Sequence, residues 1–564
     1  MIVVVTPPPL KPSEPGLSGG AAASVLHSLG TDVRWVDASL AWHRFVMDPG
    51  QSQAILQRLK SAPGLSALAR SAVRAGARPA PLQRVETYQD RSVYTSAVND
   101  LENALRLAAL PFDGLRLGIG MFAVDTPHRR LESSATLAWL SSTRGPFDDY
   151  YIQELIPSLE REHATAVAVS LTFQQQAPAA FRLAALLQER MPDAIRVLGG
   201  PLVACWRAVG FPLDKEPFSL FHRVVTGTAQ DLAELARVAD RDTTVGTRVA
   251  ARSLQAGLAA SPPEGAAGPV EPLVWESPLS VPLDQAPWHD YLSPTPTVPV
   301  ALGRGCYWRR CTFCPDHLHD KHVPCHVDRL SDWLHQVARR FPRGAMLHLT
   351  DSALPVGHLR HIASVIRRDG LALAWHGFVR VEPELAEGDV VRELAAGGCA
   401  MLQLGVESGS PGILRKLGKG ASPELARRVL RTCAAAGVRT HVYLLFGVPG
   451  ETDGDRQQTL SLVREEAGSI HAINAALLNL PKGSPMHAHA ARFGITELVP
   501  FGSDTDLSLY DDFRCGPSHP RREARRWLAH AFFKDAAVRS IQGRLRAPFK
   551  ANHLCFLDQG PTQG

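Results

Sequence analysis

The chain has 564 residues, of which 45% are hydrophobic and 20% are charged, and it carries a formal net charge of +5. A chain of this length is expected to form two or three domains with large hydrophobic cores, and so small a net charge does not favour a nucleic-acid or membrane-surface protein. No stretch of 18 residues is apolar without a charge or a proline, so no membrane-spanning helix is predicted.

The nine cysteines are too few and too unevenly placed for a disulfide framework. This usage is typical of a reducing compartment, and a cytoplasmic location is predicted. The first residues, MIVVVTPPPL, lack a basic leader and are short. They therefore predict a strand and not a signal peptide.

The amino-terminal region alternates apolar strand patterns with helical patterns, such as the helix predicted at 177–191. Strands are predicted at 1–9, 32–40, 165–173, 195–203 and 222–229. This alternation predicts an α/β domain over residues 1–240, built on a doubly wound, Rossmann-like parallel sheet. Ligands are expected at the carboxyl ends of its strands.

The loops at those strand ends are rich in small and polar residues. Glycine and serine let a ligand approach the backbone closely, so a flat macrocycle could lie against these loops. The candidate contact residues are Thr6, Pro7, Ser170, Thr172, Gly199, Gly200, Thr226 and Gly227. The alternative is a degenerate sheet that binds nothing.

A long insert at about 41–150 separates the second predicted strand from the third and is mostly helical in pattern. His43 lies at its start and is predicted to be a helix-surface histidine and not a ligand. Residues 241–296 are predicted to be a linker, because the chain becomes rich in proline, alanine and glycine from about residue 254.

Three cysteines, Cys306, Cys311 and Cys314, lie in the run GRGCYWRRCTFCPDH, directly after a strand pattern at 297–305. Thiolates at such short spacing suit zinc as well as iron–sulfur clusters. A zinc site would need a fourth ligand, for which the candidates are His317, His319, His322 and Cys325.

Five more strand patterns follow the cysteines and alternate with helical patterns such as 422–437. They lie within 345–355, 372–383, 402–420, 439–452 and 469–485. Together with 297–305 they predict a partial (β/α)6 TIM-like barrel over 297–498. The cysteines then lie on the loop after its first strand, at the face where such barrels carry their chemistry.

Residues 499–564 predict a loop followed by an amphipathic helix, which would form a helical C-terminal cap over the barrel. The run at 516–528 makes a local basic patch. A solvated helix face explains it better than a nucleic-acid site, because no stacking aromatics interleave with its arginines. Cys515, in the preceding loop, is predicted to be structural or incidental.

The cysteine segment resembles the radical S-adenosylmethionine (SAM) superfamily. In that family three cysteines bind three irons of a [4Fe–4S] cluster, and the fourth iron chelates SAM, so the resemblance implies that Cys306, Cys311 and Cys314 are cluster ligands. Phe313 fits the aromatic residue that is common before the last cysteine. The spacing departs from the usual pattern, because four residues separate the first two cysteines where most members have three.

The later strand ends resemble SAM-binding segments of the same family. Asp351 stands where many members carry a glutamate that receives the SAM amino group, and Arg380 could meet a carboxylate or pair with a nearby glutamate. The remaining candidates are Glu407 and Ser408 at one strand end, and the backbone around Phe446, Gly447 and Gly450 against the adenine.

A doubly wound sheet ahead of such a barrel resembles the cobalamin-binding domain of cobalamin-dependent radical SAM enzymes. The match depends on the order of the elements and on Gly199 and Gly200 after the fourth strand. The motif Asp-x-His-x-x-Gly, which supplies a histidine ligand to cobalt in some cobalamin proteins, is absent from the sequence. The resemblance therefore implies cobalamin bound without a protein histidine on cobalt.

These resemblances imply a radical SAM enzyme that forms a 5′-deoxyadenosyl radical. The most specific prediction is a cobalamin-dependent C-methyltransferase that acts on an unactivated carbon in natural-product biosynthesis. Two alternatives remain open: a cobalamin-dependent radical SAM enzyme that catalyses a rearrangement or cyclisation, and a zinc-stabilised, non-catalytic binding protein. A methylthiotransferase is disfavoured, because only Cys205 precedes residue 306.

The predicted partners follow from that chemistry. The substrate would be a small molecule or a short peptide, and an electron donor such as flavodoxin or ferredoxin would reduce the cluster. Neither a membrane nor a nucleic acid is predicted as a partner. The identity of the substrate is beyond the sequence.

Overall fold

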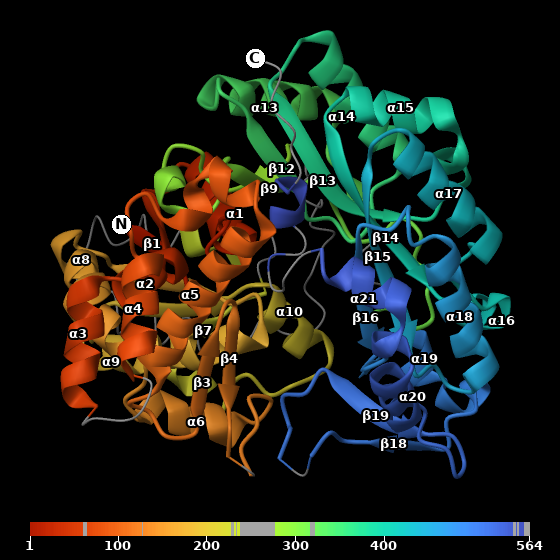
Figure 1. Cartoon of the computed structure of the whole chain (residues 1–564). Helices are drawn as coiled ribbons and strands as arrows, with labels where there is room; N and C mark the ends of the chain where they lie inside the picture. The colour runs from red at the N-terminus through yellow and green to blue at the C-terminus, as the bar shows by residue number, and fades with distance from the viewer. Residues whose placement is uncertain are drawn as a thin grey trace. The chain divides into compact units, whose positions relative to one another are not determined.

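The computed structural model (Figure 1) describes most of the chain. The described residues are 1–59, 65–126, 128–226, 231–232, 234–236, 277–315, 322–502, 504–544, 549 and 552–557. They divide into two compact units. Unit 1 lies within Met1–Val274, Leu279–Pro294 and Asp504–Ser508, and unit 2 lies within Trp275–Pro278, Thr295–Ser503 and Leu509–Gly564.

Unit 1 contains a five-stranded sheet with the order β2-β1-β5-β6-β7, and every pair of neighbours is parallel. Its strands are β1 (Ile2–Thr6), β2 (Val33–Asp37), β5 (Ala166–Ser170), β6 (Ile195–Gly199) and β7 (Arg223–Val224). This is the order of a doubly wound sheet whose direction of winding reverses between β1 and β5. The predicted topology of the amino-terminal sheet is confirmed.

Helices connect these strands, and two of them begin earlier than the sequence predicted. The connecting helices are α1 (Leu17–Ser28), α2 (Ala38–Val46), α9 (Ala177–Arg190) and α10 (Pro201–Ala208). Residues 38–40 and 201–203, predicted as strand, are helical. The Asp37 carboxylate accepts the Leu40 N–H (3.0 Å) and caps α2, and Gly200 has a φ of 109° that turns the chain into α10.

The insert after β2 is helical, as predicted, but it also contains an antiparallel hairpin that the sequence did not predict. Its helices are α3 (Pro49–Arg58), α4 (Leu65–Ala75), α5 (Arg91–Ala109), α6 (Ser134–Ser142) and α7 (Asp148–Tyr150), with α8 (Ile156–Arg161) leading to β5. The hairpin pairs β3 (Leu115–Gly118) with β4 (Met121–Val124).

His43 does not lie on a helix surface, and that prediction was wrong. Its side chain is fully buried on α2, its Nδ1 donates to the Ser39 carbonyl (2.7 Å), and burial lowers its pKa to about 4. The ring packs edge-on against Trp42, with 4.8 Å between the ring centroids. The apolar face of α2 therefore includes a neutral histidine, which periodicity counted as polar.

Unit 2 contains six parallel strands that pair in chain order, each joined to the next through a helix. The strands are β9 (Thr297–Ala301), β12 (Ala345–Leu349), β13 (Leu373–Arg380), β14 (Cys399–Glu407), β15 (Arg439–Phe446) and β16 (Ala472–Leu477). The helices are α13 (Val327–Arg340), α14 (Val356–Arg368), α15 (Gly388–Ala396), α16 (Pro411–Lys416), α17 (Pro423–Ala435) and α18 (Asp453–Glu465). The six predicted strand–helix units are all present in the predicted order.

The carboxyl-terminal part of unit 2 is not only helical, so that prediction was incomplete. It contains α19 (Pro485–Ala488), α20 (Pro520–His530) and α21 (Ala536–Gln542), and an antiparallel sheet of β17 (Leu480–Pro481), β19 (Tyr510–Arg514) and β18 (Glu497–Val499). Residues 510–514 were predicted as loop. They form a strand because Phe513 is buried in an apolar cluster and because β19 pairs with β17 and with β18.

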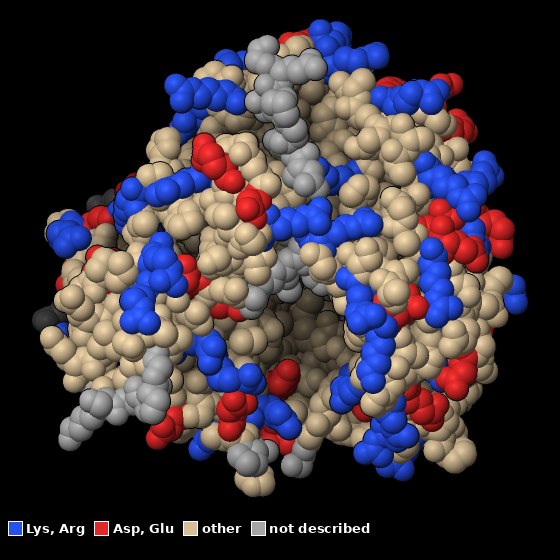
Figure 2. Space-filling view, viewed as in Figure 1, with Lys and Arg blue, Asp and Glu red and all other residues tan. Residues whose placement is uncertain are grey.

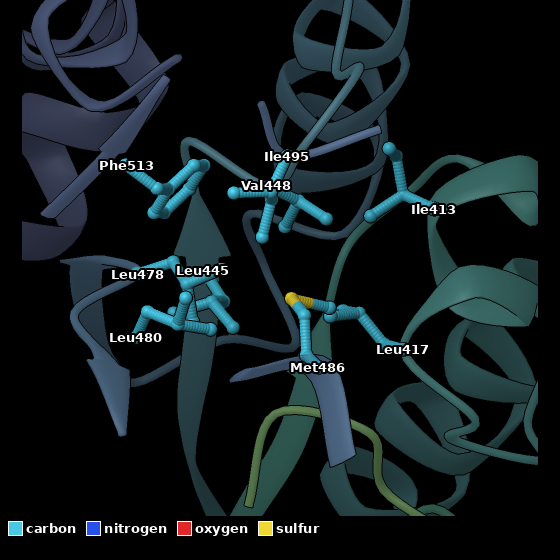
Figure 3. Close-up of a cluster of buried hydrophobic side chains, with 9 residues drawn as sticks. All are labelled: Ile413, Leu417, Leu445, Val448, Leu478, Leu480, Met486, Ile495 and Phe513. Atoms are coloured by element: carbon cyan, nitrogen blue, oxygen red, sulfur yellow. The ribbon is translucent and has the colours of Figure 1, made fainter. Parts of the chain in front are cut away.

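That apolar cluster joins the ends of the last barrel strands to the segments that follow them (Figure 3). Its buried members are Ile413, Leu417, Leu445, Val448, Leu478, Leu480, Met486, Ile495 and Phe513. Phe313 from the cysteine segment and Cys515 pack against it. The cluster therefore fixes the carboxyl-end loops of the barrel to one another.

Charged side chains of both signs are mixed on the face drawn in Figure 2. On α20, Arg522, Arg525 and Arg526 are exposed, as expected of a solvated helix face, whereas Arg521 is buried and bonded to Asp512 (3.1 Å). In the part of the chain that the structure describes, none of the helices has the length and apolar character needed to cross a membrane.

Candidate functional site

The three clustered cysteines lie on the loop that follows β9, at the carboxyl end of the parallel strands. Cys306, Cys311 and Cys314 are each half-buried, and none forms a disulfide. Gly305 and Arg309 have positive φ values of 76° and 50°. Arg309 lies in the four-residue gap between the first two cysteines, so a left-handed turn accommodates the additional residue of this loop.

The cysteine loop is anchored to the segment after α16. Thr312 donates its N–H to the Leu417 carbonyl and its hydroxyl to the Lys416 carbonyl, both at 2.9 Å. The Trp308 indole donates to the Gly418 carbonyl (3.0 Å). These bonds hold the loop at both sides of Cys311.

Two glycines make this close approach possible. Gly418 and Gly420 have φ values of 65° and 72°. A Cβ on Gly418 would lie 2.2 Å from the Arg310 carbonyl oxygen, and a Cβ on Gly420 would lie 2.2 Å from Cζ2 of Trp308. Both the backbone conformation and the packing therefore require glycine.

Arg380, at the end of β13, is buried beneath the loop. Its guanidinium carbon lies 3.7 Å from the centroid of the Trp308 ring, its Nε donates to Glu382 (2.8 Å) and its Nη2 donates to the Lys419 carbonyl (2.7 Å). Tyr307 donates to the same carboxylate (2.5 Å). Arg380 is thus paired with a glutamate, the alternative left open by the sequence, and only Nη1 meets no acceptor among the described residues.

Glu407 and Lys419 form a buried ion pair beside the loop. Glu407 ends β14 with a φ of 64°, and its Oε1 accepts from the Lys419 ammonium (2.8 Å). Burial acts to lower the pKa of Lys419, but the carboxylate of Glu407 and the thiol of Cys311 raise it above its ordinary value. Lys419 is therefore charged despite its burial.

Ser408 and Asp351 are engaged in holding backbone. The Ser408 hydroxyl is buried, lies 3.1 Å from that of Thr459 and accepts the Ser410 N–H (3.1 Å). Both carboxylate oxygens of Asp351 accept the Leu302 N–H, at 3.1 and 3.0 Å. Burial raises the pKa of Asp351 to about 6.

The turn after β15 presents backbone and not a side chain. Phe446 is fully buried against Trp527 and Phe532, with ring centroids 5.7 and 5.3 Å away. Gly447 and Gly450 have φ values of 76° and 71°. The Gly447 N–H is bonded to Glu451 (2.7 Å), and burial raises the pKa of that carboxyl to about 7.

In unit 1, four of the predicted ligand-contact residues lie at the carboxyl ends of β1 and β5, where the winding direction reverses. The Ser18 hydroxyl, on α1, lies 3.0 Å from that of Ser170 and 2.6 Å from that of Thr172. The Thr6 hydroxyl accepts from the Trp35 indole (3.0 Å). Gln176 donates to the Pro7 carbonyl (2.6 Å) and accepts the Thr172 N–H (3.1 Å).

The other predicted residues of unit 1 lie at the ends of β6 and β7. Gly199 ends β6, and a Cβ on Gly200 would lie 2.5 Å from the Leu171 carbonyl oxygen. The structure thus brings Gly200 against the loop that holds Thr172. Thr226 donates its N–H and its hydroxyl to Asp231, both at 2.9 Å, and Gly227 lies outside the described residues.

The described residues do not separate a zinc site from a cluster site. Among them, no group of three or more histidine, cysteine, aspartate or glutamate side chains, the three loop cysteines included, is arranged to hold a metal ion. His322 is half-buried, Cys325 is buried with its pKa raised to about 12, and His317 and His319 lie outside the described part of the chain.

The sequence did not assign a role to four residues at the cysteine loop. Tyr307 and Trp308 belong to the loop, Glu382 accepts from Tyr307, and Lys419 follows Gly418, whose carbonyl accepts from Trp308. Lys419 lies between two glycines in the run LGKG, and a charged residue between glycines after a short helix was a usable signal.

A polar row across the barrel strands was also missed. Gln403 on β14 donates to His376 Nδ1 on β13 (3.2 Å) and accepts from the Tyr443 hydroxyl on β15 (3.1 Å). The rings of His376 and His348 stack with centroids 4.4 Å apart. The sequence signal for this row was the presence of polar residues inside predicted parallel strands, because such strands are ordinarily apolar along their whole length.

Residues 300–463 match the Radical SAM superfamily. This segment is a radical SAM domain. It runs from the end of β9 to α18 and includes the cysteine loop and the strand ends described above. In sequence, the chain is 27% identical over 169 residues to the uncharacterized methyltransferase PH0819 of Pyrococcus horikoshii, a match that covers 29% of this chain and 36% of the relative.

A second relative is the uncharacterized protein MK0932 of Methanopyrus kandleri, which is 27% identical over 128 residues. That match covers 23% of this chain and 20% of the relative, so this chain spans well under two thirds of both curated relatives.

Two solved structures with radical SAM chemistry in their descriptions are similar to the chain. One is the radical SAM methyltransferase TsrM from Kitasatospora setae with cobalamin and a [4Fe–4S] cluster bound, at a TM-score of 0.43 and 17% identity over 65% of this chain and 75% of that one. The other is OxsB with aqua-cobalamin and SAM bound, at a TM-score of 0.49 and 15% identity over 76% of this chain and 68% of that one.

Proposed function

We propose that the chain is a radical SAM enzyme whose [4Fe–4S] cluster is held by Cys306, Cys311 and Cys314. The observation that carries the proposal is that these cysteines share one anchored loop at the carboxyl end of the parallel strands, within the radical SAM domain. The donor set fits such a cluster, because three thiolates leave one iron for SAM.

The residues at the neighbouring strand ends divide into contacts and supports. Glu407, the open Nη1 of Arg380 and the backbone at Gly447 and Gly450 are the proposed SAM contacts. Asp351, Ser408 and the ring of Phe446 are proposed to act as supports, because both oxygens of Asp351, the Ser408 hydroxyl and the ring all have partners within the protein. Glu407, in contrast, is bonded to Lys419 through Oε1 alone. When bound, the cluster supplies the electron that cleaves SAM to a 5′-deoxyadenosyl radical, and cobalamin supplies a methyl group.

We further propose that unit 1 binds cobalamin at the β1/β5 edge and that the enzyme is a C-methyltransferase acting on an unactivated carbon in natural-product biosynthesis. The proposal is supported by the winding reversal at this edge, where doubly wound sheets bind their ligands. The description of PH0819 as a methyltransferase agrees with it. No histidine belongs to the proposed contacts, so cobalt would carry no protein histidine.

The substrate class and the electron donor are proposed on chemical grounds. The cluster needs a one-electron donor, such as flavodoxin or ferredoxin. A small molecule or a short peptide is proposed as substrate. The alternative reaction is a rearrangement or cyclisation that uses the same cofactors.

The test begins with anaerobic reconstitution of the full chain, followed by iron and zinc analysis. We expect about four irons per chain and loss of that iron when Cys306, Cys311 or Cys314 is replaced by alanine. The matched control is Cys433→Ala, a buried cysteine of α17 outside the loop. Zinc without iron would reject the enzyme in favour of a binding protein.

The second step uses SAM with a labelled methyl group, cobalamin and a reductant. Release of both 5′-deoxyadenosine and S-adenosylhomocysteine supports the methyltransferase. Release of 5′-deoxyadenosine alone supports a rearrangement. If neither product forms on a chain that carries about four irons, the radical SAM activity itself is rejected.

A further inference from the structure

Two cations are buried against the cysteine loop. Only 3% of Arg380 and 7% of Lys419 is exposed. The Arg380 guanidinium stacks on Trp308 of the loop and donates to the Lys419 carbonyl. Thr312 of the loop donates its N–H to the Leu417 carbonyl, two residues before Lys419, so both cations lie beside the loop. Burying a cation costs desolvation free energy unless hydrogen bonds or an opposite charge compensate it. Two such cations lie beside this one half-buried loop.

Both cations are held in place by their surroundings. Arg380 lies flat on the Trp308 ring and is bonded on two of its nitrogens. Lys419 is held by its bond to Glu407 (2.8 Å), and its ammonium fills the space that a Cβ on Gly405 would need, 2.7 Å away. A charged side chain that is held in place changes the electrostatic potential at a neighbouring group without having to move first.

Two carboxylates face the same group of charges. Glu382 accepts from Arg380 and from Tyr307, and Glu407 accepts from Lys419. The carboxylate of Glu407 lies 2.8 Å from the Lys419 ammonium, so its negative charge opposes the field of the cations. The electrostatic potential at the loop therefore depends on opposing charges. Removing one cation makes it more negative, and removing one carboxylate makes it more positive.

We infer that Lys419 and Arg380 are positioning residues that raise the reduction potential of the cluster on this loop, and that Glu407 opposes them. The inference rests on the proposed function. If the cluster is bound by these cysteines, its reduction by the electron donor would add one electron and no proton and would take it from the 2+ to the 1+ state. A nearby positive charge stabilises the more negative, reduced form, strongly so where water is excluded.

The test is a potentiometric titration of the reconstituted full chain without SAM, followed by the electron paramagnetic resonance signal of the reduced cluster. Lys419→Met and Glu407→Gln break the same ion pair but remove opposite charges. We expect Lys419→Met to make one-electron reduction about tenfold less favourable, which is about 59 mV more negative. Glu407→Gln should shift the potential by a similar amount in the positive direction.

Three controls separate charge from packing. Lys419→Arg keeps the charge and should keep the wild-type potential, and Arg380→Lys should change it less than Arg380→Gln. Arg427→Gln removes a cation that is paired with Glu465 (2.7 Å) on α17 and α18, and it should have no effect.

The outcomes distinguish this inference from the proposed function. If wild-type protein assembles no [4Fe–4S] cluster, both fall. If the cluster assembles and the two opposite substitutions shift the potential in the same direction or not at all, only the inference is overturned. If Lys419→Met does not assemble the cluster, the reduction potential of Glu407→Gln tests the inference by itself. A positive shift supports the inference, and a negative shift or no shift overturns it.

Discussion

The carboxylate of Asp351 accepts hydrogen bonds from the backbone where β9 ends, four residues before Cys306. A single aspartate thus ties β12 to the start of the cysteine loop. Because it is buried, its neutral form is favoured, and the pKa of about 6 lies above the ordinary 3.8. This difference links the stability of the barrel to pH.

The first prediction is a loss of stability as pH rises from about 4 to about 6 that depends on Asp351. In this range the unfolded chain has already released the proton that the folded chain keeps, so the free energy of unfolding falls by at most about 1.4 kcal/mol per pH unit. The decrease ends above about pH 6. Denaturant unfolding at several pH values measures it.

Asp351→Asn is the variant for this measurement, since its amide oxygen still accepts the Leu302 N–H and it does not titrate. The difference in unfolding free energy between variant and wild type should change by about 3 kcal/mol across the window and be constant above it. A difference that is independent of pH would show that Asp351 is already ionised in the folded chain.

The second prediction concerns Arg182, which holds the buried Asp148 in unit 1. Its Nε and Nη2 donate to Asp148 at 3.0 and 2.6 Å, and Asp148 is 1% exposed. Arg182→Met should lower the free energy of unfolding by about 3–5 kcal/mol, because it leaves a buried carboxylate without its cation. The measurement is denaturant unfolding of the full chain at neutral pH.

The matched control is Arg144→Met, which breaks the pair of Arg144 with Asp149 (2.5 Å) close to Asp148 in sequence. That arginine is 60% exposed, so the loss should be about 0–1 kcal/mol. Equal effects of the two substitutions would show that burial does not determine the strength of the Arg182 pair.

At the scale of elements, the segment after α16 determines where the cysteine loop lies. Its glycines are not interchangeable with other glycines of similar backbone conformation. Gly420 and Gly437 have φ values of 72° and 75°, but only Gly420 faces a neighbour, the Trp308 ring, whereas nothing lies within 4 Å of a Cβ at Gly437.

The third prediction compares alanine at these two positions. Gly437→Ala should cost about 1–2 kcal/mol through backbone strain alone and should leave the iron content unchanged. Gly420→Ala carries the same strain and in addition displaces Trp308, so the reconstituted chain should lose iron. Iron per chain and thermal unfolding are measured on both, and equal iron content would contradict the anchoring role of Gly420.

The elements that could be predicted from sequence are those that consist of a continuous run of buried apolar residues. The strand IVVVT of β1 is entirely buried and was evident from its composition. The cysteines and the six strand–helix units indicated the radical SAM resemblance in the part of the chain where residues 300–463 match that superfamily. Boundaries failed where a cap or a glycine ended a strand early, as at Asp37 and Gly200.

The elements that could not be predicted depend on distant partners. Strand β19 has the sequence YDDFR, in which polar residues dominate, and it exists because β17 and β18 pair with it and Phe513 is buried. In the same way, Trp308 and Arg380 are 72 residues apart in the chain, and only the fold shows that they stack. Local patterns carry no information about such contacts.

At the scale of the whole molecule, the proposed methyltransferase needs each unit to load its own cofactor. Unit 2 offers the cysteine loop, and unit 1 offers the edge between β1 and β5. There the Ser18 hydroxyl lies 3.0 Å from that of Ser170 and 2.6 Å from that of Thr172. A substitution that blocks this edge should therefore weaken the binding of cobalamin and leave the loading of the iron–sulfur cluster unchanged.

The fourth prediction uses Ser18→Trp, which places a large ring at that edge. The full-length variant should bind hydroxocobalamin at least about tenfold more weakly than wild type, a change of about 1.4 kcal/mol, while its iron per chain stays the same. Visible absorbance of the protein after gel filtration measures the bound cobalamin. Ser28→Trp, at the exposed end of the same helix, is the matched control and should bind as wild type.

Each result of this experiment has one meaning for the molecule. If Ser18→Trp binds cobalamin as tightly as Ser28→Trp, the β1/β5 edge is not the binding site, whatever the activity of the enzyme. If wild-type chain does not retain hydroxocobalamin, unit 1 is a sheet without that ligand, and the radical SAM domain must act without a cobalt-bound methyl group. Loss of iron in Ser18→Trp would instead show that a change in unit 1 alters cluster loading in unit 2.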